Sequence, residues 1–258
     1  MANFQYANVK PILEFKAFQD FIDDLKDEND AKFGVYPPDY RDLFNLYTKV
    51  RRIRAVSILE YGSGWSTSAL ALGLKENRES FASFVRANLR HPNPFVLMTV
   101  DASKTFLEIA VNRATKILDV ELIPVHSEVH ILQIASRIAH IYIDVPNFTS
   151  DFVYLDGPDS DQVKGSVFGR DINFGSDGRA YGLPMSADLL ITENFFWPGT
   201  EIVIDGRGAN ARFLIHSFNR PWKYSYDTET DQHHFLLDEQ PWGRYSRTLL
   251  ELKNNPII

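Results

Sequence analysis

The chain has 258 residues, no cysteine and a formal net charge of −7. The lack of cysteine excludes disulfides, thiolate catalysis and zinc–thiolate sites, and the negative charge argues against a nucleic acid partner, which usually needs a basic face. With 44% hydrophobic and 24% charged residues the chain can bury one core of ordinary size. It has no apolar run of about 18 residues and no signal-peptide core, which predicts a soluble, cytoplasmic protein without a membrane partner.

The first 54 residues predict a helical cover for the rest of the chain. Phe15, Phe18 and Ile22 have the spacing of one helix face, and the prolines at 37–38 then interrupt the pattern. A second helix is expected over 39–54. We expect both helices to cover a sheet edge or the mouth of a ligand site, ahead of a main domain over 55–250.

Residues 56–67 predict a buried strand, a glycine turn and the start of a helix. Gly62 and Gly64 allow the backbone to turn sharply with no side chain between it and a ligand. Ser66 or Thr67 can cap the helix that follows. A third glycine at the dinucleotide-binding spacing is missing, and Glu60 suits a cofactor with a cationic amino acid end better than a pyrophosphate.

The E-x-G-x-G stretch at 60–64 resembles motif I of the class I S-adenosylmethionine-dependent methyltransferases. In that family the acid usually acts through water or loop backbone near the methionine moiety, and the glycines face the cofactor. The alternative is a tight strand-to-helix turn in another α/β protein.

A second buried strand is expected over 95–100, ending at Asp101, with Ser103 capping a helix over 104–118. Residues 75–94 are expected to form an inserted connection between the first helix and this strand. Asp101 can accept hydrogen bonds from ribose hydroxyls. Capping of the following helix is the alternative role for this carboxylate.

Residues 120–128 predict the third strand and a loop, including Ser127, at which the family usually contacts the adenine ring. The alternation over 129–143 predicts a hairpin insertion. An apolar strand then ends at Asp156, and the following Gly157 and proline complete a D-G-P turn that resembles motif IV of the same family. A plain Asp-Gly turn is the alternative.

Residues 159–182 predict a substrate lid or recognition loop, with partial disorder as the alternative. A helix is expected over 185–197 and another strand over 200–205, ending at Asp205. Because Asp156 and Asp205 end neighbouring parallel strands, they are expected at one edge of the sheet. One of them would act as general base while Arg207 or Arg212 orients the acceptor, or both would bind Mg²⁺ together with Asn210.

The last third of the chain is aromatic and predicts a hairpin over 223–237. Its tryptophans, with Trp197, could stack on a sugar face, and core packing is the alternative.

Together these patterns predict a single α/β structural domain. It has the Rossmann-like class I methyltransferase fold, a three-layer sandwich with a mostly parallel seven-stranded sheet and one antiparallel strand, with insertions near 129–143 and 159–182. The resemblance implies methyl transfer from S-adenosylmethionine to an oxygen of a sugar or other small hydroxylated acceptor, by a chain that could also form a homo-oligomer. A non-catalytic glycan- or cofactor-binding module and a nicotinamide-dependent oxidoreductase are the alternatives. The cofactor contacts that the resemblance implies are Glu60, Tyr61, Gly62, Ser63, Gly64, Ser66, Thr67, Asp101, Ala102, Ser127, Asp156 and Gly157.

Overall fold

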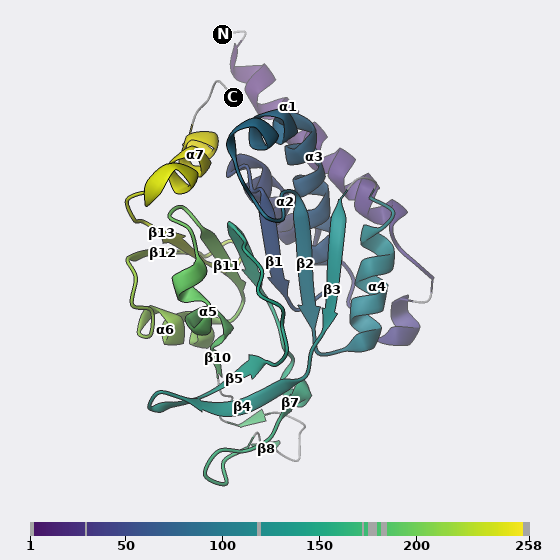
Figure 1. The fold of residues 1–258 in the computed structure, drawn as a ribbon. Helices are drawn as coiled ribbons and strands as arrows, with labels where there is room; N and C mark the ends of the chain where they lie inside the picture. Colours follow the sequence, from purple (N-terminus) through teal and green to yellow (C-terminus); the bar gives the residue numbers. More distant parts are fainter. Residues whose placement is uncertain are drawn as a thin grey trace.

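The computed structural model describes residues 3–28, 30–117, 120–171, 173–174, 180–181 and 185–254. Its centre is a seven-stranded sheet in the order β12-β13-β11-β6-β1-β2-β3 (Figure 1). All neighbouring pairs from β11 to β3 are parallel, and β13 runs antiparallel to both β11 and β12. The prediction of a mostly parallel sheet with one reversed strand is confirmed. The sheet strands are β1 (Ser57–Tyr61), β2 (Val96–Asp101), β3 (Glu121–His126), β6 (Phe152–Leu155), β11 (Glu201–Asp205), β12 (Trp222–Asp227) and β13 (Gln232–Leu237).

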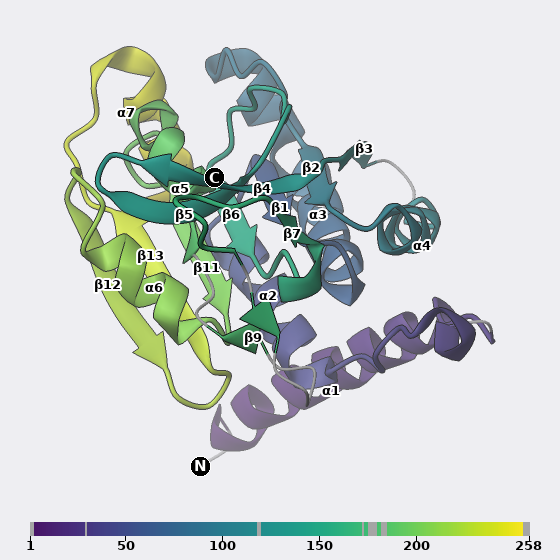
Figure 2. The same cartoon turned by 90° about the horizontal axis from the view of Figure 1, so that it is seen from below.

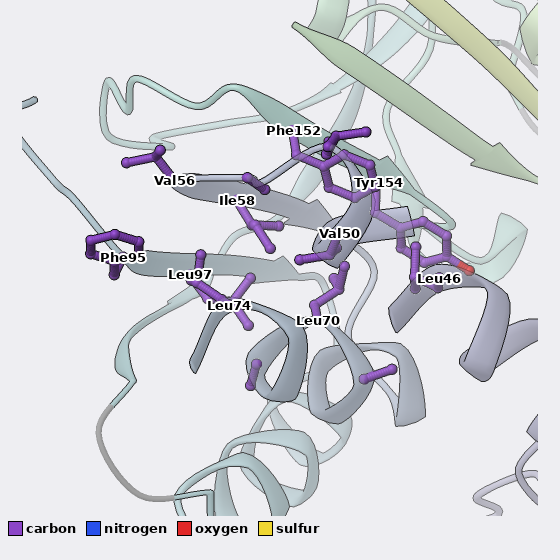
Figure 3. Close-up of a cluster of buried hydrophobic side chains, with 14 of the residues drawn as sticks. Leu46, Val50, Val56, Ile58, Leu70, Leu74, Phe95, Leu97, Phe152 and Tyr154 are labelled. Atoms are coloured by element: carbon purple, nitrogen blue, oxygen red, sulfur yellow. The ribbon is translucent and has the colours of Figure 1, made fainter. Parts of the chain in front are cut away.

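One face of the sheet is covered by helices from both ends of the chain, namely α1 (Asn3–Asp24), α2 (Tyr40–Arg52), α3 (Trp65–Asn88) and α7 (Gly243–Asn254). Leu46 and Val50 of α2 meet Leu70 and Leu74 of α3 over Ile58 of β1 (Figure 3). In the view from below, α1 lies outside α2 (Figure 2). The 3-10 helix η1 (Asp30–Phe33) lies between α1 and α2 in the sequence.

The opposite face is covered differently. Its core includes Leu189 of the short α5 (Asp188–Ile191), Leu214 of α6 (Gly208–Ile215), and Val129 and Tyr142 of the predicted hairpin. That hairpin, β4 (Val129–Ile134) and β5 (Arg137–Tyr142), is confirmed. It extends into a four-stranded sheet with β10 (Met185–Ser186) and β7 (Val163–Lys164), so the insertion forms part of the core.

Two expected elements differ in the structure. Residues 75–94 do not form a separate connection, because α3 continues to Asn88. Asn77 explains the continuation: its buried amide donates to the carbonyls of Val50 and Ala55 and fixes this part of α3 against α2. The next helix, α4 (Lys104–Ala114), begins after its predicted Ser103 cap and ends at Ala114.

The helix predicted over 185–197 is also wrong. Residues 185–186 pair with β5, α5 has four residues, and the 3-10 helix η3 covers Glu193–Phe195. The buried Asp188 carboxylate accepts from the Tyr142 backbone N–H and from the Ser186 hydroxyl, and these bonds fix the chain in its strand-to-turn conformation. The predicted 159–182 lid contains the 3-10 helix η2 (Ser160–Gln162), β7, β8 (Asn173–Phe174) and β9 (Ala180–Tyr181). Residues 172, 175–179 and 182 of that lid lie outside the described residues.

Candidate active site

A cavity of about 590 Å³ opens at the carboxyl ends of β1, β2, β6 and β11. This is the edge of a parallel sheet at which ligands of open α/β folds bind. Each of the four strands contributes a loop to the wall, and α2 with the segment before it forms the opposite side. The polar groups of the wall include Ser63, Ser66, Asp39, Asp42, Asp101, Tyr142, Tyr154, Asp156, Asp159, Asp161, Asp205 and Arg207.

Glu60 organises the glycine turn from beneath. Its side chain is fully buried and accepts from the Ser66 hydroxyl at 2.6 Å and the Thr67 hydroxyl at 2.7 Å. Burial raises the pKa of Glu60 to about 7, although these two hydrogen bonds act in the opposite direction. Neither Ser66 nor Thr67 is the N-cap of α3, contrary to the prediction, although Thr67 takes part in the cap because its hydroxyl accepts from the Gly64 N–H at 3.1 Å. Gly64 is the N-cap, and the two hydroxyls tie the first turn of α3 to the end of β1.

The two glycines of the turn have different roles. Gly62 has a φ of +89°, and a Cβ there would lie 2.6 Å from the backbone nitrogen of Gly157. The glycines of the two predicted motifs thus pack backbone against backbone. Gly64 is extended, and a Cβ on it would meet no atom within 4 Å. Since Gly64 also borders the cavity, it is the glycine that leaves space for a ligand.

Asp101 borders the cavity and fixes the loops around it. One carboxylate oxygen accepts from the backbone N–H and the hydroxyl of Ser63, both at 2.6 Å, and the other accepts from the Ser103 N–H at 2.6 Å. A carboxylate has about four acceptor positions, so one is left at the second oxygen for a ligand hydroxyl.

Asp156 lies between the glycine turn and the end of β11. The Arg207 guanidinium donates to the backbone carbonyls of Asp156 at 2.5 Å and Pro158 at 3.0 Å, and its Nε lies 3.6 Å from the Asp156 carboxylate. Asp156 borders the cavity, and water reaches 47% of its side chain. Partial burial raises the pKa of Asp156 to about 7; Arg207 opposes the rise and Asp205 adds to it.

Asp205 lies beside Asp156 because β11 and β6 are paired in parallel. Its carboxylate accepts from the Tyr154 hydroxyl at 2.9 Å. The Tyr154 ring belongs to the core and lies near Leu46 (Figure 3), so only its hydroxyl end reaches the site. Burial raises the pKa of Asp205 as well.

No protein-family profile and no curated protein sequence matches the chain. Solved structures are similar in fold. The methyltransferase PaMTH1 of Podospora anserina, in a structure with bound SAH, is 12% identical over 86% of this chain and 88% of that chain, with a TM-score of 0.50. An O-methyltransferase from Bacillus cereus in complex with SAH aligns at 16% identity over 85% and 91% of the two chains, with a TM-score of 0.45. The O-methyltransferase TomG of Streptomyces achromogenes, involved in tomaymycin synthesis and in complex with SAM, aligns at 14% identity over 85% and 90%, with a TM-score of 0.44.

The strand order, the single reversed strand and the match to PaMTH1 agree on one architecture. The chain has the class I methyltransferase fold. Because the sequence identities are low, the similarity shows the fold alone. In this class I methyltransferase fold the cavity described above lies at the carboxyl ends of the parallel strands, where the sequence placed it.

Several predicted site residues do not border the cavity of this methyltransferase fold. Glu60 and Thr67 act through the turn, whereas Tyr61 and Ala102 pack in the core on the other side of the sheet. Ser127 is buried and does not border the cavity. The Ser127 hydroxyl donates to the Ile143 carbonyl and is not presented to a ligand. Asp156, Gly157, Asp205 and Arg207 do come together, as predicted.

The predicted metal site is not supported. Asn210 is buried, its side-chain oxygen accepts from the Ser186 N–H at 2.7 Å and its amide donates back to the Ser186 carbonyl, so both ends are engaged away from the two aspartates. Among the described residues, no group of three or more His, Asp or Glu side chains is placed to hold a metal ion.

The tryptophans proposed for sugar stacking also lie elsewhere. Trp197 packs against Tyr245, Trp222 stacks on Phe218, and Trp242 lies under Arg220. The tryptophan that borders the cavity is Trp65, the first residue of α3.

Sequence reasoning missed Asp42, Tyr142 and the 34–38 segment of the cavity wall. The segment is fastened in place because the Trp65 indole donates to the Tyr36 carbonyl at 3.0 Å. Asp42 lies in the first turn of α2, where an acidic residue is common because it stabilises the helix N-terminus. The sequence alone therefore does not distinguish this stabilising role from a role in ligand binding, which depends on α2 facing the cavity. Within the part of the chain that the structure describes, no helix is long and apolar enough to cross a membrane.

Proposed function

We propose that this protein transfers a methyl group from S-adenosylmethionine to a hydroxyl oxygen of a small acceptor. The observation that carries the proposal is Asp156. It is a strand-end carboxylate with a pKa near 7, and it lies in one cavity with an open glycine turn on one side and a second aspartate on the other. An acid with a pKa near neutrality is well suited to act as a general base.

The cavity residues fit the cofactor on three counts. Gly64 leaves open space beside the first turn of α3, and Asp101 keeps one acceptor position for a ribose hydroxyl. The Tyr142 hydroxyl, buried at the edge of the cavity, has no hydrogen-bond partner among the described residues. The half of the cavity beneath Ser63 and Asp101 would therefore hold the cofactor, and the half between Asp156, Asp205 and α2 would hold the acceptor.

The bound cofactor supplies an electrophilic methyl group on a sulfonium, whose sulfur keeps the bonding electron pair when the methyl leaves. Asp156 would accept the proton of the acceptor hydroxyl as the new O–CH₃ bond forms. Arg207 fixes the loop of Asp156 through two backbone carbonyls, and Tyr154 orients Asp205. These contacts fix the two aspartates, which would allow them to hold the acceptor in line with the methyl group, and such placement supplies much of the rate enhancement in a transfer of this kind.

Calorimetric titration with S-adenosylmethionine and, separately, with NAD tests the cofactor. We expect saturable binding of S-adenosylmethionine; binding of NAD alone would favour the oxidoreductase and refute the proposal. Methyl-labelled cofactor offered with a panel of small hydroxylated acceptors then tests catalysis. Cofactor binding with no methylated product from any acceptor would favour a non-catalytic binding module.

The role of Asp156 is tested by Asp156→Asn, with Asp24→Asn as the matched control, since Asp24 is exposed on α1 and does not border the cavity. Loss of a general base typically costs about 10²–10⁴-fold in rate. We expect a loss of this size in kcat for D156N with unchanged cofactor affinity, and wild-type turnover for D24N. Turnover by D156N at the wild-type rate would contradict its role as the base.

A further inference from the structure

The charge of the cavity wall is strongly one-sided. Among the described residues that border it, seven are aspartates and one, Arg207, is a cation. Arg207 is already bonded to two backbone carbonyls and lies next to the Asp156 carboxylate. Arg41, on α2, is turned away toward Glu229 at 2.5 Å. The acceptor half of the cavity therefore has more carboxylates than cations to balance them.

The carboxylates of this half have different partners. Asp39 is the N-cap of α2 and accepts from the N–H groups of Arg41 and Asp42, at 3.0 Å and 3.2 Å. Asp205 accepts from Tyr154. Among the described residues, the Asp42 carboxylate has neither a hydrogen-bond donor nor an ion-pair partner, although it is half-buried at the cavity wall next to Leu43.

Asp42 and Asp205 face the same space from opposite walls. Both side chains border the cavity, and burial together with the negative charges of Asp39 and Asp205 raises the pKa of Asp42 to about 6. Bringing like charges together in a partly enclosed site is unfavourable unless a ligand with the opposite charge lies between them.

One further feature of this cavity suits a ligand with a cationic end. Tyr36, at the mouth, is 85% exposed and presents an aromatic ring, a surface that attracts ammonium groups. The cofactor carries one net positive charge, and the Asp101 carboxylate in the cofactor half of the cavity balances that charge.

We propose that the acceptor is a small hydroxylated compound carrying an ammonium group, which Asp42 and Asp205 hold while Asp156 faces the hydroxyl. This inference rests on the proposed methyl transfer and names the class of acceptor for it: an amino alcohol or amino sugar. An anionic acceptor would be repelled by the same three carboxylates. The ammonium positions the acceptor and takes no part in the chemistry, so the methyl group goes to oxygen.

Pairs of acceptors that differ only in an amino or a hydroxyl group test the inference on the wild-type protein. Glucosamine with glucose, and 2-aminoethanol with ethylene glycol, are suitable pairs, and labelled methyl transfer is the readout. We expect kcat/KM to favour the amine by about tenfold or more, equivalent to one buried ion pair of about 1.4 kcal/mol. The preference should shrink as salt concentration rises. The product should carry its methyl group on oxygen.

Asp42→Asn should reduce this preference to near unity while leaving the affinity for S-adenosylmethionine unchanged, and Asp24→Asn should keep it. Equal use of both members of each pair would overturn the inference and leave the proposed function standing, whereas a methyl group found on nitrogen would overturn both. Methylation of neither member of any pair would instead count against the proposed function itself. Because the acceptor comparison uses the wild-type chain, its result holds even if the Asp42 variant fails to fold.

Discussion

The glycine turn offers a sharp test, because its two glycines are predicted to fail in different ways when replaced by alanine. In Gly62→Ala the new Cβ would lie 2.6 to 2.8 Å from three backbone atoms of residues 156–157, and the φ of +89° is unfavourable for alanine. The positive φ costs roughly 1–2 kcal/mol and overpacking about 1–3 kcal/mol. Lower entropy of the unfolded chain returns roughly 0.4–1 kcal/mol. The net loss should be about 2–4 kcal/mol.

Gly64→Ala is the matched variant, since its Cβ would meet no protein atom and its backbone is extended. The free energy of unfolding should change by no more than about 0.5 kcal/mol. Because Gly64 borders the cavity, we expect the added methyl group to take up space that the cofactor needs, and the dissociation constant for S-adenosylmethionine should rise by about tenfold or more.

Urea unfolding followed by tryptophan fluorescence measures the first effect, and calorimetric titration the second. With an m value of about 2–3 kcal/mol per molar urea, the G62A midpoint should fall by roughly 1 M. A G62A midpoint equal to that of the wild type would refute the backbone packing between the two turns. Wild-type cofactor affinity in G64A would refute the placement of the cofactor beside the turn.

Three other outcomes follow from the titrating groups. The pKa of Glu60 is raised to about 7 in the folded protein, so its contribution to stability is present below its unfolded pKa of about 4.5 and is lost as pH rises through 7. Glu60→Gln should therefore compare less unfavourably with the wild type at pH 8 than at pH 5, by roughly 1–3 kcal/mol in urea unfolding; a gap independent of pH would contradict the buried acid. As the base, Asp156 must be ionised, so kcat/KM should rise with pH through a midpoint near 7. Stopped-time assays between pH 5.5 and 8.5 cover roughly 1.5 pH units on either side of this midpoint. A flat profile over that range would count against Asp156 as the base. Excess EDTA should leave turnover unchanged because Asn210 is bound to Ser186, and loss of activity restored by Mg²⁺ would show that the two aspartates do bind a metal.

The main lines of the fold could be predicted because they depend on local patterns. The buried strands that lead to Asp101, Asp156 and Asp205 can be recognised in the sequence as apolar runs followed by an acid. Parallel pairing brings the ends of such strands to one edge of the sheet. The hairpin over 129–142 was predicted from its alternation for the same reason.

Residues whose partners are distant in sequence could not be assigned this way. The helix predicted over 185–197 is wrong because Asp188 bonds to Tyr142, 46 residues away, which no local pattern reveals. Asn210 was misassigned because an amide suited to metal binding is equally suited to bind the backbone of a distant strand, here at Ser186.

The sequence by itself therefore determined the class of fold, the order of its strand ends and the glycine turn, since each depends on residues within about one element of each other. Only the tertiary structure decided the roles of individual residues within this fold. It showed Gly62 to be a packing glycine and Gly64 the open one, and it brought Asp42 of α2 to the same cavity as Asp205, 163 residues later. The physical reason is that burial, like-charge repulsion and close backbone contact depend on which surfaces meet when the chain folds.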